Sequence, residues 1–208
     1  MKINYQLETD KIIKSIPENK VPRLLLHSCC APCSSYVIEY LSDYFEIDVL
    51  YYNPNIDTAE EYEKRAKEQI RLIQSMELKN KVNCIVEEYT PKEFYDCVKG
   101  LEKEPEGGKR CVECFKLRLE KTAMLAKEGG YDYFTTTLTI SPLKNSQILN
   151  EIGKEMSEKY QVDYLYSDFK KKSGYLRSCE LSEKYGLYRQ NFCGCIFSKI
   201  NLDKDSDI

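Results

Sequence analysis

The sequence predicts an α/β fold in which a parallel sheet is flanked by helices on both faces. Short apolar runs alternate with segments whose apolar residues recur at helical spacing, and this alternation is typical of parallel sheets. A length of 208 residues suits one domain with a sizeable core. We therefore expect a single domain over residues 1–208. Residues 1–20 form a polar leader or first helix, and residues 170–208 form a helical and loop extension that closes over the site.

Five apolar runs have the length and composition of strands. The first run ends in small residues, and Asn53-Pro54-Asn55 stops the second. The third has Val82, Cys84 and Val86 alternating on one face. Ser141-Pro142 forms the exit of the fourth. In chain order, the predicted strands cover residues 23–29, 46–52, 81–89, 131–140 and 162–169.

Helical segments are expected between these strands. Thr58 and Glu61 have the capping-box pattern that begins a helix, and Gly129-Gly130 is a typical helix end. The polar stretch that ends at Arg110 is expected to be a connection. The predicted helices cover residues 31–44, 111–127 and 145–159, with one more that begins at Thr58 and one within the extension.

The predicted strand ends carry the unusual residues of the chain. Parallel sheets bind ligands at the carboxyl ends of their strands. Three features fall at such ends, namely the region around Cys29, the Asn53-Pro54-Asn55 stop and the Ser141-Pro142 exit. The sequence therefore predicts a functional site at this edge of the sheet.

Cysteine is abundant, with ten cysteines against one histidine. The chain shows no apolar signal segment, and no apolar run approaches the ~20 residues of a membrane span, so we expect a cytoplasmic protein without a membrane partner. In that reducing compartment, grouped cysteines indicate metal binding or catalysis more often than structural disulfides. The formal net charge of −3 gives no basic footprint, so nucleic-acid binding would need a local basic patch.

The first cysteine group is His27-Ser-Cys-Cys-Ala-Pro-Cys33, where a predicted strand meets a helix. A helix N-terminus lowers the pKa of a cysteine and so favours the thiolate, which binds metals or attacks electrophiles. Cys30 and Cys33 could instead form a redox dithiol of thioredoxin type, but Cys29 beside them could scramble its disulfide. Small buried cysteines at a tight turn are the third interpretation.

Two further groups follow in the sequence. Cys111 and Cys114 lie on one face of a predicted helix, with Arg118 one turn beyond them. This spacing is used by zinc, iron–sulfur and redox sites, and the arginine could stabilise an anionic cluster or a phosphate. Cys193 and Cys195 are separated by a glycine that permits a tight turn. They can serve as metal ligands or as a vicinal redox dithiol.

The number of grouped cysteines favours electron transfer over a structural role. Seven exceed the four ligands of one zinc site, and soft thiolates favour zinc, copper(I) or iron–sulfur. Four would hold a [4Fe–4S] cluster and leave three for a second metal or a redox pair. The residues expected to serve in packing are Cys84, Cys97, Cys179 and the single histidine, His27.

Together these motifs resemble the cobalamin-independent epoxyqueuosine reductase family, QueH. The resemblance covers most of the chain, through residues 27–33, 52–56, 61–65, 110–118, 134–142 and 187–195. It implies a Rossmann-like sheet of the HUP type. It also implies reduction of epoxyqueuosine to queuosine at the wobble position of the tRNAs for Asp, Asn, His and Tyr, the last step of queuosine biosynthesis.

The resemblance also implies a set of site residues. The implied [4Fe–4S] ligands are Cys29, Cys30, Cys111 and Cys114. Cys193 and Cys195 match a pair regarded as redox-active and are the catalytic candidates, either as a disulfide or as metal ligands. The alternative is a second, mononuclear iron near the cluster, whose ligands would be some of Cys30, Cys33, Cys193 and Cys195.

Substrate and partners follow from the same resemblance. The substrate-binding candidates are Tyr52, Asn53, Asn55, Arg118, Ser141, Tyr188 and Arg189. We expect tRNA as the partner and an external electron donor, because the chain has no flavin or nicotinamide fingerprint. The basic candidates for tRNA contact are Lys64-Arg65, Lys67, Lys170-Lys171-Lys172 and Arg177, and a flipped base could stack on Tyr51, Tyr52 or Tyr188.

Two other classes of function remain as alternatives. A structural zinc-binding protein would use its thiolates only to brace loops. A thioredoxin-like thiol oxidoreductase would need only one dithiol pair and would keep its activity without Cys111 and Cys114.

Overall fold

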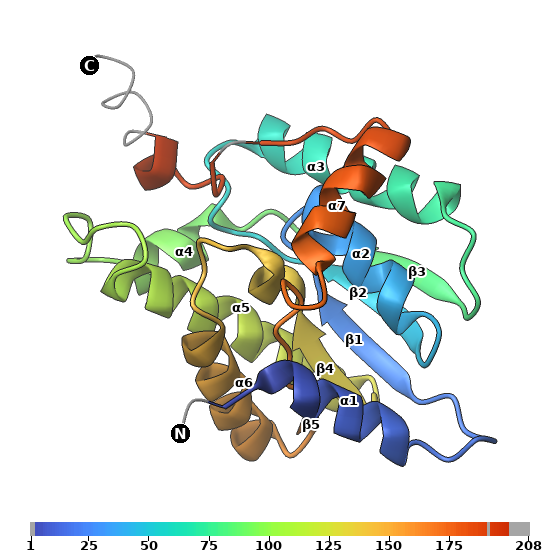
Figure 1. Cartoon of the computed structure of the whole chain (residues 1–208). Coiled ribbons are helices and arrows are strands. Elements are labelled where there is room, and N and C mark those ends of the chain that lie inside the picture. The colour runs from blue at the N-terminus through green and yellow to red at the C-terminus, as the bar shows by residue number, and fades with distance from the viewer. Residues whose placement is uncertain (1–2, 191, 200–208) are drawn as a thin grey trace.

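The computed structural model describes residues 3–190 and 192–199 of the chain. Five strands form one sheet in the order β3-β2-β1-β4-β5 (Figure 1). Every neighbouring pair is parallel. The predicted α/β class with a parallel sheet is confirmed. No helix in the described ranges is both long and apolar enough to cross a membrane.

The strands lie where the sequence predicts them, but all of them are shorter than expected, β1 and β2 slightly and β3, β4 and β5 by several residues. Their bounds are β1 Arg23–His27, β2 Glu46–Tyr51, β3 Val82–Val86, β4 Tyr133–Thr136 and β5 Asp163–Tyr164. The prediction that β4 extends to residue 140 is wrong, because the Thr136 side chain accepts a hydrogen bond from the Leu138 N–H and begins the 3-10 helix η1, Thr137–Ile140. The prediction of a strand up to residue 169 is also wrong. There the Ser167 N–H bonds to the Asn150 side chain at 2.9 Å instead of to a strand.

Helices α1 to α7 flank the sheet. Their bounds are α1 Tyr5–Ser15, α2 Ala31–Leu41, α3 Ala59–Ser75, α4 Pro91–Cys97, α5 Lys109–Glu128, α6 Ser146–Tyr160 and α7 Gly174–Lys184. The expected cap of α3 is present, since Thr58 Oγ1 accepts from the Glu61 N–H at 3.2 Å. Helix α4 was not expected, because its sequence is polar apart from a few residues such as the buried Phe94.

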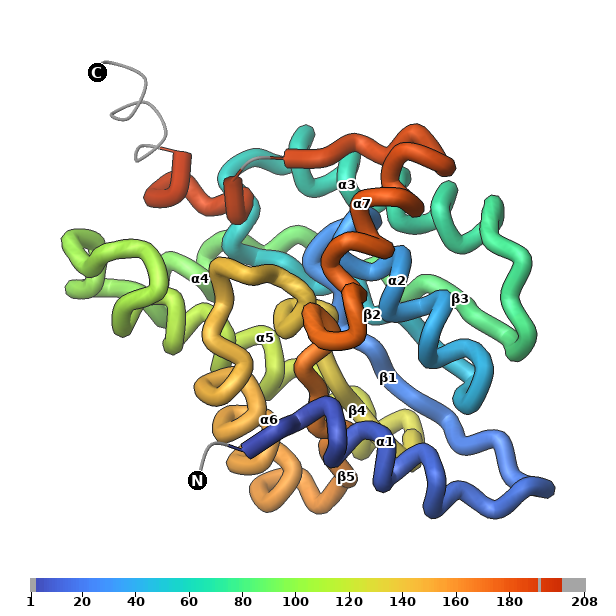
Figure 2. Tube along the Cα trace, viewed as in Figure 1, coloured from blue at the N-terminus to red at the C-terminus, as the bar shows by residue number. Residues whose placement is uncertain are grey.

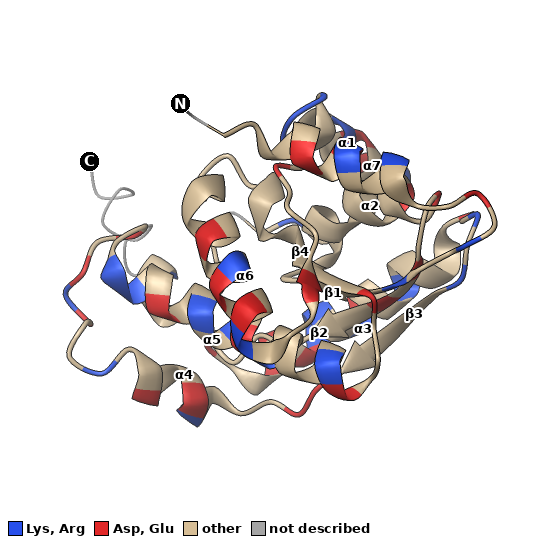
Figure 3. Cartoon of the chain, turned by 90° about the horizontal axis from the view of Figure 1, so that it is seen from below, with Lys and Arg blue, Asp and Glu red and all other residues tan. Residues whose placement is uncertain are grey.

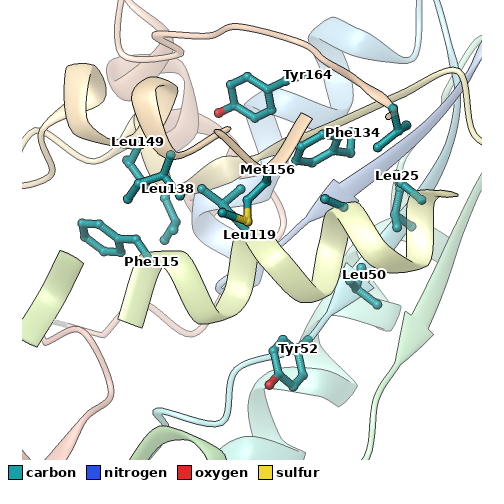
Figure 4. Packing of buried hydrophobic residues seen from close by; sticks show 14 residues of the cluster. Leu25, Leu50, Tyr52, Phe115, Leu119, Phe134, Leu138, Leu149, Met156 and Tyr164 are labelled. Atoms are coloured by element: carbon teal, nitrogen blue, oxygen red, sulfur yellow. The ribbon is translucent and has the colours of Figure 1, made fainter. Parts of the chain in front are cut away.

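The two faces of the sheet have separate cores. Leu24 and Leu26 of β1 pack with α2 and with apolar residues of α1 and α3. Leu25, between them, points to the opposite face and joins the core formed with α5 and α6 (Figure 4). All three leucines are at most 1% exposed, and each contributes roughly 1.5–3 kcal/mol by its burial. This alternation holds the carboxyl end of β1 rigidly in the middle of the fold.

The chain after α7 returns to the carboxyl edge of the sheet (Figure 2). Helix α7 packs on α2. Arg71 of α3 then donates to the carbonyl oxygens of Tyr185 and Gly186 at 3.0 and 3.2 Å. Further on, the Asp57 N–H donates to the Gly194 carbonyl at 2.9 Å. The described part of the C-terminal extension is therefore fixed beside the loop that follows β2.

Candidate metal centre

The carboxyl ends of three neighbouring strands form the floor of the site. In the parallel register, His27 of β1 lies between Leu50 of β2 and Thr136 of β4. Each of these three strands ends within a few residues of this position. Segments that follow β1, β2 and β4 therefore meet at one edge, as predicted for ligand sites in such sheets.

His27 is a buried packing residue, as expected. Its Nδ1 lies 2.9 Å from Thr136 Oγ1, and its Nε2 lies 3.1 Å from the carbonyl oxygen of Tyr52. Burial lowers the pKa of His27 to about 3, so the imidazole is neutral at pH 7. The ring ties β1 to its two neighbours directly below the first cysteine group.

Cys29, Cys30 and Cys33 form a compact group of thiols. Their sulfur atoms all lie within 4.8 Å of one another, and the Cys29 and Cys30 sulfurs are 3.9 Å apart. Cys30 is the N-cap residue of α2, but its side chain makes no capping hydrogen bond, so the sulfur remains available to a ligand. Hydrogen bonds from Cys30 and Cys33 hold the pKa of Cys29 well below its usual range. The hydrogen bond to Cys29 raises the pKa of Cys30 to about 12.

Thr137 holds this group in place from the neighbouring segment. The Cys29 N–H donates to Thr137 Oγ1 at 3.3 Å, and the same hydroxyl lies 3.6 Å from the Cys29 sulfur. Thr137 was not among the predicted site residues. Its only signal is its place among the four threonines within residues 134–142, a segment that the resemblance already covered.

Helix α5 contributes Cys111 and Cys114 near its N-terminus. The Gly107 N–H points at the Cys111 sulfur at 3.3 Å. Cys114 lies one turn further along and is buried, and this burial raises its pKa to about 12. A metal cation would offset that penalty, because it binds the deprotonated form of the thiol.

The Cys193-Gly194-Cys195 turn supplies the third group. Gly194 has a φ of +105°, which favours glycine, and a Cβ atom there would lie 2.9 Å from Arg65 Nη1. The Cys195 sulfur lies 3.6 Å from Ser198 Oγ. Burial raises the pKa of Cys195. The turn is thus held between α3 and the last described residues.

One cavity brings the three cysteine groups together. It has a volume of about 400 Å³, and the cysteines that line it are Cys29, Cys30, Cys33, Cys111 and Cys193. A smaller cavity of about 20 Å³ is lined by Cys111, Cys114, Cys193 and Cys195. Cys111 and Cys193 line both cavities, so each of the seven grouped cysteines borders one or both of two neighbouring cavities. Among the described residues, only Cys29, Cys30 and Cys33 form a group of three whose sulfur atoms lie within 4.8 Å of one another.

Three cationic side chains lie around these sulfurs. Arg118 is 1% exposed and Arg65 is 3% exposed, and within the described part of the chain the Nη2 atom of each lacks a hydrogen-bond partner. Lys144 lines the large cavity. Burial lowers the pKa of Lys144, but the Cys193, Cys29 and Cys33 sulfurs raise it by more, so the ammonium stays charged. This charge distribution suits an anionic group bound to the thiols.

Comparison with known proteins identifies the family. Residues 24–201 match the family model described as epoxyqueuosine reductase QueH. The chain belongs to the QueH family. Among proteins named epoxyqueuosine reductase QueH, that of Staphylococcus epidermidis is 46% identical over 98% of this chain and 88% of its own length. That of Streptococcus pyogenes is 45% identical over 95% of this chain and 78% of its own. That of Thermotoga maritima is 38% identical over 84% and 89%.

The substrate-binding candidates of this QueH-family chain divide into two sets. Ser141 and Arg189 line the large cavity, and Asn55 and Arg118 line the small one. The residues not placed at either cavity are Tyr52, Asn53 and Tyr188. The Tyr52 ring packs in the core beneath α5 (Figure 4). Its hydroxyl donates to Glu93. Asn53 donates to the Ser28 carbonyl at 2.8 Å, and the Tyr188 ring faces the Lys64 ammonium at 3.5 Å.

The predicted basic candidates for RNA contact in this QueH-family chain are largely neutralised by carboxylates. Lys170 pairs with Asp168, Lys172 with Asp10, Arg177 with Glu39 and Glu180, Arg65 with Glu61, and Lys67 with Glu63. Charges of both signs are also interspersed along α4, α5 and α6 (Figure 3). Tyr51 is fully buried, so its ring cannot receive a base.

The remaining cysteines lie outside the two cavities. Cys84 and Cys97 are partly buried against small apolar clusters, as expected for packing residues. Cys179 is partly exposed on α7. All ten cysteines are free thiols in the structure, so the Cys193–Cys195 pair is not joined by a disulfide.

Proposed function

We propose that this QueH-family protein reduces the epoxide of epoxyqueuosine to queuosine in tRNA, in the cytoplasm, with a [4Fe–4S] cluster as the electron carrier. The names of its relatives supply the reaction class. The observation that carries the proposal is the convergence of three distant cysteine groups on one cavity at the carboxyl edge of the sheet. A cavity of about 400 Å³ falls in the range that holds a small organic molecule.

The side chains fit an anionic iron–sulfur cluster. The donor set is entirely soft sulfur, as such clusters require. The cluster ligands that we propose are Cys29, Cys30, Cys111 and Cys114. The unpartnered Nη2 atom of Arg118 supports this assignment, because a buried N–H donor without a partner costs free energy that an anionic ligand would remove.

The other three cysteines supply a second function beside the cluster. We propose that Cys33, Cys193 and Cys195 hold a second, mononuclear iron, or that Cys193 and Cys195 act as a redox dithiol. Cys33 supports the first arrangement, since its sulfur lies within 4.8 Å of two proposed cluster ligands. In both arrangements, the second electron that the reaction needs is stored beside the cluster, which carries the first electron.

The reaction removes one oxygen atom from the substrate. Two electrons and two protons convert the epoxide to a carbon–carbon double bond and release one water molecule. The cluster, when bound, supplies electrons one at a time from an external donor. The protein positions the epoxide and excludes bulk water. Lys144 places a charged N–H donor in the cavity, where it can bind the epoxide oxygen, and Phe115 gives the same cavity an apolar wall.

The test is the conversion of tRNA that carries epoxyqueuosine. The protein, purified anaerobically and supplied with a strong reductant, is expected to convert the modified nucleoside to queuosine, as measured by mass spectrometry of nuclease digests. A matched reaction without reductant is expected to give no product. Absence of queuosine from a sample with full iron and sulfide content would overturn the proposal.

A further inference from the structure

The rim of the large cavity carries an exposed apolar side chain, Leu143, that is not packed in the core. Leu143 is 83% exposed, the largest exposed fraction among the exposed large apolar side chains of the described residues. A single exposed leucine is ordinary on a protein surface. Leu143 differs because it also lines the cavity. Among the other strongly exposed apolar side chains, Tyr175, 41% exposed, shares this property.

A short turn fixes the direction of Leu143. The Leu143 N–H donates to Ser141 Oγ at 3.3 Å, and the Lys144 N–H donates to the Ser141 carbonyl at 3.2 Å. Pro142 adds a fixed φ between these residues. The turn therefore exposes Leu143 at the rim, while the next residue, Lys144, is partly buried against the thiols. Leu143 therefore lies at the mouth of the cavity, and Lys144 lies further inside it.

A nucleotide in an RNA loop must leave its stack to enter such a cavity. Extrusion costs a few kcal/mol, because the stacking on both neighbours is lost. Proteins that unstack bases often insert an apolar side chain into the gap, which restores part of that contact. An exposed leucine at the rim, on a rigid turn, has the position and chemistry for this task. The Tyr175 ring, which lines the same cavity, offers a surface on which a flanking base can stack.

We propose that Leu143 is a wedge that fills the gap left in the anticodon loop when the modified nucleotide enters the cavity. This proposal rests on the proposed function, because it takes an RNA loop as the substrate. It makes Leu143 a positioning residue for the RNA and gives it no part in the redox chemistry. It also places an RNA contact at the cavity mouth, on Leu143 and Tyr175.

The experiment compares Leu143→Ala with Leu176→Ala, a matched variant on α7. Leu176 is 59% exposed and does not line the cavity. For tRNA carrying epoxyqueuosine, we expect L143A to lower kcat/KM about ten-fold, mainly through KM, which corresponds to the loss of one stacking contact. L176A is expected to match the wild type. Leu143→Phe keeps an apolar wedge and is expected to retain most of the activity.

A second readout follows the stacking directly. 2-Aminopurine placed next to the modified nucleotide in an anticodon stem-loop gains fluorescence when it loses its stacked neighbour. We expect saturating wild-type protein to raise this fluorescence. The size of the rise is expected to differ from wild type with L143A and to equal the wild-type rise with L176A. If L143A has wild-type KM and a wild-type fluorescence change, the wedge is refuted while the reductase function stands. If loaded wild-type protein converts no epoxyqueuosine, both proposals are overturned.

Discussion

The Arg118 guanidinium reaches back one helical turn and donates from Nε to the carbonyl oxygen of Cys114 at 3.2 Å. Its Nη1 lies 3.4 Å from Asn53 Oδ1, which anchors the side chain to the loop after β2. The guanidinium is therefore held against the buried cysteines independently of any bound group. Burial lowers the pKa of Arg118, but the Cys114 and Cys193 sulfurs raise it by more, so the positive charge is retained.

Arg118→Met is expected to reduce cluster content while leaving the fold intact. Methionine fills a similar volume but leaves the thiolate charges uncompensated. Because the substitution also removes the hydrogen bonds to the Cys114 carbonyl and to Asn53 Oδ1, we expect the free energy of unfolding of the metal-free protein to fall by about 1–3 kcal/mol, which leaves the protein folded. Iron and sulfide per chain should fall well below the wild-type value after identical reconstitution.

Arg118→Lys and Arg177→Met are the controls for that variant. Lysine keeps the charge and is expected to restore part of the cluster content. Arg177 lies on α7, is 42% exposed and pairs with Glu39 and Glu180, so its replacement should leave iron and sulfide unchanged. Wild-type cluster content in R118M would show that this cation does not stabilise the bound group.

Gly194→Ala is expected to disable the Cys193–Cys195 turn. Alanine at a φ of +105° is strained, and its Cβ would lie 2.9 Å from Arg65 Nη1. Arg65 is buried and its Nε donates to Glu61 at 2.7 Å, so it cannot easily move away. We expect turnover to fall at least about ten-fold, because small displacements of reacting groups have effects of this size.

Gly186→Ala separates backbone strain from the contact with Arg65. Gly186 also has a positive φ, of +56°, but its Cβ would meet no atom within 4 Å. We expect G186A to lower the free energy of unfolding by about 1–2 kcal/mol and to retain near wild-type turnover. Equal turnover in G194A and G186A would mean that the geometry of the cysteine turn is not critical.

Asp48, within the inner strand β2, is expected to make stability depend on pH. Burial raises its pKa, but hydrogen bonds from Asn83 and Tyr131, each at 2.7 Å, and the Arg23 guanidinium bring it below the ordinary value of 3.8. The unfolded chain therefore binds a proton more readily than the folded one. This contribution is fully present above pH ~4 and is lost as pH falls through the folded pKa.

Asp48→Asn tests this contribution by urea unfolding at several pH values. At pH 7 we expect the variant to lose about 1–2 kcal/mol, which reflects its weakened hydrogen bonds. The difference from wild type should shrink as the pH is lowered below 4. Asp43→Asn, at an exposed position after α2, is the matched control and should show no difference. A D48N deficit that is constant from pH 7 to pH 3 would contradict the assignment.

The sequence predicts the centre of the fold well and its margins less well. The apolar run of β1 and the cap at Thr58 are local signals, and both appear as expected. The end of β4 is not local, because it depends on hydroxyl groups of its threonines that compete with the strand ladder. Helix α4 is short and polar, so its periodicity is too weak to detect.

The cysteine groups were visible in the sequence, but the charges around them were not. Spacing alone shows that Cys111 and Cys114 share a helix face. It does not show that Lys144 approaches the thiols, because that contact depends on the turn after η1. The pairing of Lys172 with Asp10 joins residues 162 positions apart, so the basic run could not be recognised as neutralised. Tertiary packing decides both features.

The central claim is that the cysteine groups share one iron–sulfur centre, and metal analysis tests it most directly. Anaerobically reconstituted wild-type protein is expected to contain about four sulfide and about four iron per chain, or about five iron where the mononuclear site is also filled, with the broad visible absorption of a [4Fe–4S] cluster. Cys111→Ser with Cys114→Ser should abolish both, whereas Cys84→Ser with Cys179→Ser, outside the cavities, should retain them. Zinc without sulfide in the wild type, or full iron and sulfide in the first double variant, would contradict the account.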